Sequence, residues 1–139
     1  MFTVTKSFKI PIGHRLSKLV NHRCFSSHGH NVKIDIEIQR ETLNGNDMVI
    51  DFYDLKRIAN ETIDQWDHAM ILNSEDKFVE FPKSQRLIKV TCGDPTSENM
   101  CFILYNIMYD KFTAHDEELK LKSVTIWESD ESYAKYEPS

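Results

Sequence analysis

The sequence lacks an apolar stretch of about 18 residues, and its N-terminus lacks the basic-then-apolar order of a secretion signal. We therefore expect no membrane span, no signal peptide and no membrane partner. Only three cysteines are present, without a CxxC pair, which is typical of the reducing cytoplasm rather than of a disulfide framework. The chain also has no excess of positive charge: 17 Lys and Arg stand against 22 Asp and Glu, and the formal net charge of -5 argues against a nucleic-acid partner.

What remains is ordinary globular composition. The 139 residues are 40% hydrophobic and 28% charged, which gives room for one domain with its own core and little else. No internal repeat, low-complexity tract or linker divides the chain. We expect a single domain over residues 1–139 in a soluble cytoplasmic protein.

Apolar residues follow two periods along the chain. Strict alternation from Val32 to Ile38 predicts a half-buried strand, and a similar pattern over 2–10 predicts another, stopped by Pro11 and followed by a loop to Ser27. Helical spacing predicts helices over about 55–66 and 97–112. Further strands are expected at 87–90, 122–128 and 132–136. The order predicts an α+β fold with both helices on one face of an antiparallel sheet, whose open edge favours oligomers.

Three histidines suggest a metal site. His28 and His30 are two apart on an extended segment, so both imidazoles point to the same side, and Gly29 between them lets the backbone approach closely. His14 would complete a three-histidine set that leaves a fourth position for water or substrate. The alternative is that these are ordinary polar residues at the start of a strand. His22 and His115 have no such partner and are expected at the surface.

Cys24 precedes His28 by four residues and should lie near any metal held there. A nearby cation favours the thiolate, which would make Cys24 a nucleophile or a base. Two alternatives stay open: a fourth ligand in a closed structural zinc site, or a small buried hydrophobe.

Two further signals involve carboxylates. Asp67 could orient His68 for proton transfer, although a histidine at a helix C-terminus is also a common cap. Glu128 ends an otherwise apolar strand face and could accept hydrogen bonds from paired N–H groups of a ligand. Its alternative is that the strand has simply reached solvent.

Taken together, these segments resemble the 6-pyruvoyltetrahydropterin synthase family, over nearly the whole chain. The matching segments are Phe8 with His14-Arg15-Leu16, Cys24 to Asn31, Met48 to Lys56, Asp67-His68 with Leu72-Asn73, Pro95 to Asn99, and Trp127-Glu128-Ser129. Each is weak alone, but all six occur in the family's order. The gap of three residues between Cys24 and His28 is similar to that of the bacterial branch, the 6-carboxytetrahydropterin synthases.

The resemblance implies the tunnelling fold (T-fold), an antiparallel four-stranded sheet with two helices on one face, whose subunits close into an oligomeric barrel. Homohexamers with active sites between subunits are usual in this family. It also implies a pterin triphosphate substrate, 7,8-dihydroneopterin triphosphate, and release of acetaldehyde and triphosphate in queuosine and deazapurine biosynthesis.

The same resemblance assigns roles to residues of this chain. Zn²⁺ would be held by His14, His28 and His30. Proton transfer would fall to Cys24, Asp67 and His68. The pterin would be bound by Thr96, Ser97, Glu98 and Glu128.

Three departures accompany the match. Ala69 stands where relatives often have a polar residue, the segment 74–94 is long, and only Arg15 and Lys56 suggest themselves for the triphosphate. Two other functions stay open: an enzyme of the same kind that forms 6-pyruvoyltetrahydropterin, and a non-catalytic pterin-binding or zinc-stabilised interaction protein.

Overall fold

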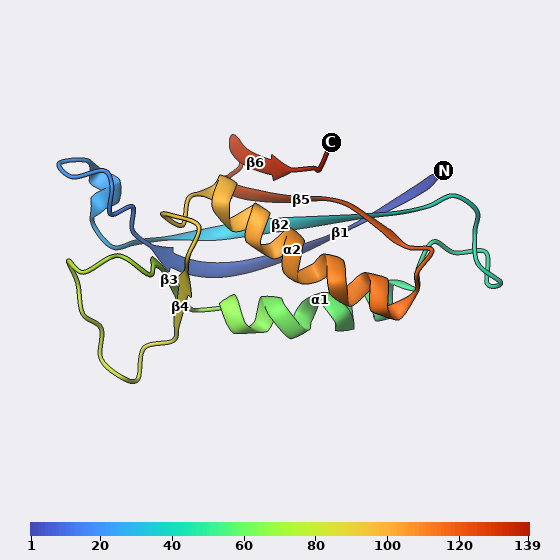
Figure 1. The fold of residues 1–139 in the computed structure, drawn as a ribbon, viewed down its shortest axis with the longest axis horizontal. Coiled ribbons are helices and arrows are strands. Elements are labelled where there is room, and N and C mark those ends of the chain that lie inside the picture. Colours follow the sequence, from blue (N-terminus) through green and yellow to red (C-terminus); the bar gives the residue numbers. More distant parts are fainter.

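The computed structural model describes residues 1–139 and has a six-stranded sheet as its centre (Figure 1). The strands are β1 (Phe2–His14), β2 (His28–Arg40), β3 (Met70–Asn73), β4 (Leu87–Val90), β5 (Lys120–Ser129) and β6 (Ser132–Tyr136). The helices are η1 (Arg23–Phe25, a 3-10 turn), α1 (Phe52–Trp66) and α2 (Ser97–His115). Across the sheet the strands run in the order β4-β3-β1-β2-β5-β6.

The prediction of a four-stranded antiparallel sheet is wrong in both strand number and direction. Strands β1, β2, β5 and β6 do pair antiparallel, but β3 pairs parallel to β1, and β4 parallel to β3. The sheet is therefore mixed. Strand β3 has four residues, and three of them are buried, so it has no polar-apolar alternation that a sequence pattern could detect.

Strand β1 also continues past Pro11, where the sequence pattern predicted its end. Pro11 pairs with Asn31 of β2, and its carbonyl accepts a hydrogen bond from the His68 N–H on the other side. Since the N and O of one strand residue point the same way, the missing N–H of Pro11 faces away from β2. Pairing with β3 begins only at Gly13, so no ladder hydrogen bond is lost at the proline.

One hydrophobic cluster of 27 buried residues joins the sheet to both helices. The buried face of β2 supplies Val32, Ile34, Ile36 and Ile38, and the helices supply Leu55, Ile63, Leu104 and Met108 among others. Figure 1 shows α1 and α2 side by side along the long strands. The opposite face of β2, from Lys33 to Gln39, is half-exposed and polar, so the helices cover one face of the sheet, as predicted.

Each helix begins at a side-chain cap. Asp51 accepts a hydrogen bond from the Tyr53 N–H at the start of α1, and Thr96 accepts one from the Asn99 N–H at the start of α2. The predicted helices are therefore present, with α2 three residues longer than the apolar pattern suggested. Neither helix combines the length and the apolar character that a membrane crossing needs.

Candidate metal centre and active site

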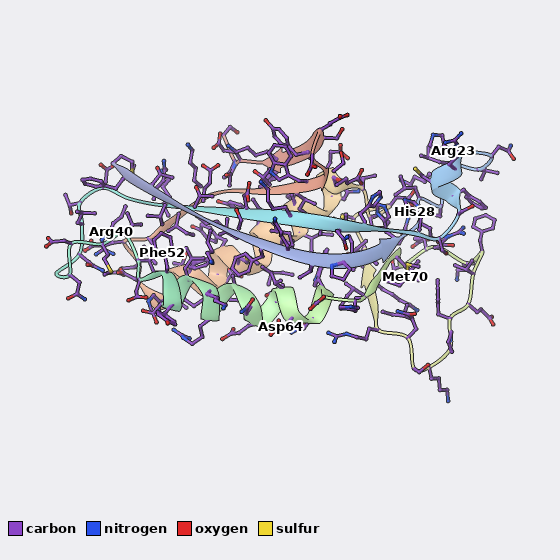
Figure 2. The ribbon with its side chains drawn as sticks, turned by 180° about the vertical axis from the view of Figure 1, so that it is seen from behind. Arg23, His28, Arg40, Phe52, Asp64 and Met70 are labelled. Atoms are coloured by element: carbon purple, nitrogen blue, oxygen red, sulfur yellow. The ribbon has the colours of Figure 1, made fainter.

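Three imidazoles meet where the β1–β2 ladder ends. His14 pairs directly with His28, and His30 lies two residues further along β2 on the same face, opposite Ile12. One ligand nitrogen from each ring can be chosen so that all three lie within 4.8 Å of one another. Figure 2 places His28 at the end of the sheet near η1 and Met70, away from Arg40 and Phe52. The ladder therefore brings together the three histidines that the sequence singled out.

Backbone carbonyls orient two of these rings. The Nδ1 of His14 lies 2.7 Å from the Pro95 carbonyl, and the Nδ1 of His28 lies 2.7 Å from the Ser26 carbonyl. A carbonyl only accepts, so each Nδ1 must carry the hydrogen, and each Nε2 keeps its lone pair. The Nε2 of His14 is buried and has no hydrogen-bond partner. An unpartnered buried lone pair beside two more imidazoles fits a metal ion with nitrogen ligands.

The electrostatics also favour a neutral ring at His14. Burial is the main reason why the pKa of His14 is lowered, and charge on His28 and His30 lowers it further. The Pro95 hydrogen bond and the charge of Glu128 act in the opposite direction but do not outweigh burial. A neutral imidazole is the form that ligates metals.

Cys24 lies in η1, half-exposed, outside the group of ligand atoms. Its N–H donates to the Nδ1 of His22, and its carbonyl accepts from the N–H of Leu16, which ties the loop after β1 back on itself. This geometry speaks against a closed site of one cysteine and three histidines. It leaves the thiol free.

The predicted contact between Asp67 and His68 is present. Asp67 is the C-cap of α1, and its carboxylate lies 2.8 Å from the Nδ1 of His68. His68 has the left-handed φ of 60° and a side chain that is 74% exposed. Its ring borders a hollow of about 290 Å³ lined by Gly13, Gly29 and their neighbours. His28 also lines this hollow, so the Asp67–His68 pair lies beside one of the three metal-site histidines.

The beginning of α2 lies against the metal site, because the Pro95 carbonyl bonds His14. Thr96 is the N-cap, Ser97 is buried with an unpartnered hydroxyl, and Glu98 is exposed in the first turn. Glu128 is half-buried in β5, where the pairing with β6 shifts register. Such a bulge re-aims a side chain, and the charge of Glu128 reaches His14.

Sequence reasoning missed two buried carboxylates that shape this region. Asp94 accepts hydrogen bonds from Ser17, Lys18 and Asn73, whereas Asp76 binds the Nε of Arg15 at 2.6 Å. Arg15 is thereby paired and buried, with its Nη2 left without a partner, and its contact with the triphosphate stays a prediction. Neither aspartate lies in a spacing pattern that could have revealed it. Lys56 is exposed on α1.

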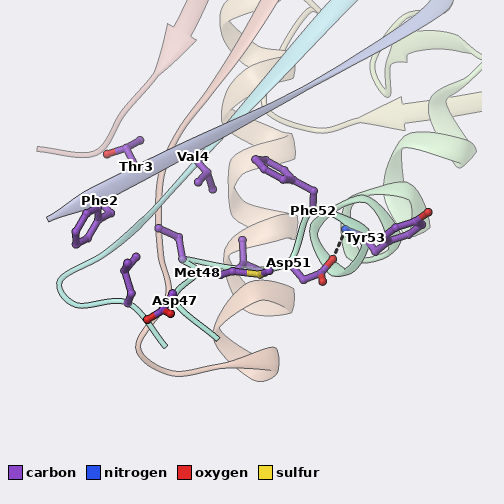
Figure 3. A pocket seen from close by; sticks show the side chains of 11 residues that line it. Phe2, Thr3, Val4, Asp47, Met48, Asp51, Phe52 and Tyr53 are labelled. Carbon is purple, nitrogen blue, oxygen red and sulfur yellow. Dashed lines mark hydrogen bonds between the residues drawn. The ribbon is translucent and has the colours of Figure 1, made fainter. Parts of the chain in front are cut away.

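A second hollow lies at the far end of the molecule (Figure 3). It measures about 540 Å³ and is lined by residues of the start of β1, the 43–51 loop and the first turn of α1. Its acidic residues are Asp47 and Asp51, and Asp51 already caps α1. The stretch of β1 from Val4 to His14 separates this hollow from the metal site by about 33 Å. The residues that line this hollow do not form a cluster of metal ligands or of proton-transfer groups.

The sequence model of the family described as 6-pyruvoyl tetrahydropterin synthase matches residues 3–139. The chain belongs to this family. A relative from Haemophilus influenzae, named 6-carboxy-5,6,7,8-tetrahydropterin synthase, is 32% identical over 99% of both chains. The resemblance seen in the sequence is thus confirmed at the family level.

Solved structures share the fold of this family member. An uncharacterized protein from Wolinella succinogenes superposes with a TM-score of 0.81 at 19% identity, covering 99% of this chain and 98% of that one. The 6-pyruvoyl tetrahydropterin synthase of Plasmodium vivax does so with a TM-score of 0.75 at 16% identity, covering 98% of each chain. The two helices and the curled sheet are those of the pterin synthase fold.

Proposed function

We propose that this chain is a zinc-dependent lyase that converts 7,8-dihydroneopterin triphosphate into 6-carboxy-5,6,7,8-tetrahydropterin, with release of acetaldehyde and triphosphate. The observation that carries the proposal is the set of three imidazoles that each bring a ligand nitrogen within 4.8 Å of the others, two of them with the Nδ1 bonded to a backbone carbonyl. The name of the Haemophilus influenzae relative, matched along its full length, supports the choice of reaction.

The metal would be held by His14, His28 and His30. Zinc bound there would act as a Lewis acid toward oxygens of the pterin side chain and make the adjacent C–H bonds more acidic. With three protein ligands, such a site leaves a position open for substrate.

The chain's own groups would move the protons. Cys24, with a thiol free of any ligand role, would remove a proton from the substrate side chain. His68, held at 2.8 Å by Asp67, would deliver one. Glu128 would accept hydrogen bonds from the pterin's amino and ring N–H groups, and Thr96, Ser97 and Glu98 would line the pterin pocket.

A site that uses both the metal and His68 favours an assembly of several chains. Within one chain the side chain of His68 bonds Asp67 and none of the three imidazoles, although it borders the same hollow as His28, and we propose that a neighbouring copy supplies the pair that acts with the metal. Both edges of the sheet, β4 and β6, are also free to pair with other strands. We propose a homohexamer with active sites between subunits.

Mixing two inactive variants tests the shared site. Cys24→Ala and His68→Ala should each be inactive alone. After co-refolding, mixed assemblies should regain part of the activity, because some interfaces then combine an intact Cys24 with an intact His68. Failure of any mixture to regain activity, with mixed assemblies present by mass spectrometry, would contradict the shared site.

The reaction itself is tested by anaerobic incubation of the zinc-loaded protein with 7,8-dihydroneopterin triphosphate, with products identified by mass spectrometry. Formation of 6-carboxytetrahydropterin and acetaldehyde supports the proposal. Formation of 6-pyruvoyltetrahydropterin would support the same active site but assign the chain the 6-pyruvoyl reaction of the family. Bound pterin without turnover would favour a binding protein.

A further inference from the structure

Asp94 is the centre of a hydrogen-bond network beside the metal site, and it is 5% exposed. Its Oδ1 accepts from the Ser17 hydroxyl at 2.6 Å and from the Asn73 amide at 3.0 Å, and its Oδ2 accepts from the Lys18 N–H at 2.8 Å. These donors come from the loop after β1 and from the end of β3. One carboxylate thus joins two segments that are far apart in sequence.

The backbone of Asp94 is held equally firmly. Its carbonyl accepts from the Thr96 N–H and from the Asn99 side-chain amide, both at 2.8 Å. The side chain and the backbone together fix the turn that leads into α2. The next residue in that turn is Pro95, whose carbonyl lies 2.7 Å from the Nδ1 of His14.

We propose that Asp94 is a positioning residue for the metal ligand His14, acting through the carbonyl of Pro95. The carbonyl keeps the hydrogen on Nδ1 and directs the Nε2 lone pair toward His28 and His30. Asp94 keeps that carbonyl in place by tying the Asp94–Thr96 turn to the loop that follows His14. The inference rests on the proposed function only in taking the ligand of the three histidines to be a metal.

The charge of Asp94 suits this role. Burial alone would raise its pKa, but the hydrogen bonds from Ser17, Lys18 and Asn73 outweigh burial and hold the pKa below its ordinary value. The carboxylate therefore stays an acceptor on both oxygens. An asparagine at this position has one acceptor oxygen, so its amide group would face a donor, either the Lys18 N–H or the Ser17–Asn73 pair.

Asp94→Asn is the test, and Asp116→Asn is the matched control. Asp116 also accepts hydrogen bonds, from Arg40 and from the Glu118 N–H, but it caps the other end of the 19-residue helix α2. Both variants lose a carboxylate that stabilises the fold, and about 28 Å of helix separates the two positions. Only Asp94→Asn should affect His14.

Two measurements detect a change at His14 without depending on enzymatic turnover. Titration of the metal-free proteins with Zn²⁺ against a competing chelator gives the dissociation constant. It should rise about tenfold in Asp94→Asn, as outer contacts of metal ligands usually count for about 10–100-fold, and stay unchanged in Asp116→Asn. The ¹⁵N-edited NMR spectrum of the imidazoles gives the tautomer of His14, which should be Nδ1–H in the wild type and mixed in Asp94→Asn.

The inference is overturned if Asp94→Asn keeps both the wild-type dissociation constant and the Nδ1–H tautomer. It is also overturned if both variants weaken Zn²⁺ binding equally, since a general loss of stability then explains the effect. If Asp94→Asn does not fold, Ser17→Ala removes a single hydrogen bond to the carboxylate, and the tautomer must then shift in the same direction. Failure of the proposed lyase reaction would leave these readouts intact. If the wild type bound no Zn²⁺, the tautomer in the metal-free protein would still decide whether Asp94 positions His14.

Discussion

His14 and His28 lie directly opposite each other in the β1–β2 ladder, and their ring centroids are 4.5 Å apart. The register of the two strands therefore decides whether the imidazoles meet. A slip of one residue would turn one set of side chains to the other face of the sheet. The long ladder, from Phe2 opposite Arg40 to His14 opposite His28, pins this register through the buried row Val32 to Ile38.

Removing one imidazole should abolish tight metal binding. In His28→Ala the metal loses a ligand, so we expect affinity for Zn²⁺ to fall by more than the about 10–100-fold typical of outer contacts. The zinc content of the purified protein, measured by mass spectrometry, checks this. His115→Ala is the control, because His115 lies in the last turn of α2 and should leave the zinc content unchanged. A His28→Ala protein that retains full zinc would show that these histidines do not hold the metal.

Removing the thiol should separate chemistry from metal binding. Cys24 lies outside the group of ligand atoms, so Cys24→Ala should keep its zinc while turnover of dihydroneopterin triphosphate falls by about 10²–10⁴-fold, the usual contribution of an acid or base. Turnover and zinc content are measured on the same preparation. Loss of zinc in this variant would favour the closed site of one cysteine and three histidines.

The sequence contained enough information for the metal site because the i, i+2 spacing of His28 and His30 has a direct geometric meaning in a strand. It did not contain the contacts that orient the rings. Pro95 is 81 residues from His14, and it acts through a backbone carbonyl that every residue type has. Such a partner leaves no signature in residue type or spacing.

The fold, like the metal site, was predictable from the sequence only in part. The long strands and both helices have periodic apolar faces, whereas β3 is four residues long and almost fully buried. Its parallel pairing depends on where α1 returns the chain, which is a matter of tertiary packing. The same packing lets β1 run through Pro11, because no strand lies beside the side that lacks the N–H.

The buried pair of Arg15 and Asp76 should matter for stability. Both side chains are nearly inaccessible, and Arg15 also lies 4.3 Å from the centre of the Phe25 ring, next to Cys24. Asp76→Ala would leave a buried guanidinium unpaired, so we expect the free energy of unfolding to fall by about 3–5 kcal/mol. Urea denaturation measures it.

A double variant distinguishes charge from packing at this pair. In Arg15→Met/Asp76→Leu no charge is left unpaired, so much of the lost stability should return. Glu61→Ala, which removes an exposed partner of Lys111, is the control and should change stability little. If the double variant were as unstable as Asp76→Ala, the unpaired charge of Arg15 would not be the cause of the lost stability.

Stability should decrease in acid partly through Asp116. A hydrogen bond from the Arg40 guanidinium is the main reason why the pKa of Asp116 lies below its ordinary value. A carboxyl whose pKa is lower in the folded state stabilises the fold above its unfolded pKa, near 3.8, and this contribution is lost as the pH falls through the folded pKa. Urea denaturation between pH 7 and pH 2 should therefore show a shallower acid loss for Asp116→Asn than for the wild type. If the free energy of unfolding fell equally with pH in both proteins, the lowered pKa of Asp116 would not contribute to the loss of stability in acid.

Gly29 should be needed for the close approach of the two strands that bear the histidines. A Cβ atom at this position would lie 3.1 Å from the carbonyl oxygen of Ile12, a backbone atom that can move only with the ladder. Gly29→Ala should therefore shift β1 against β2 by a few tenths of an ångström, between His28 and His30. Because ligand geometry tolerates little displacement, we expect weaker Zn²⁺ binding by about tenfold, comparable to the loss of an outer contact. Gly45→Ala is the matched control, since a Cβ there meets no atom within 4 Å. Chelator competition on both variants decides the point: equal affinities would mean that the ladder absorbs the methyl group without moving the imidazoles, and that Gly29 has no part in forming the metal site.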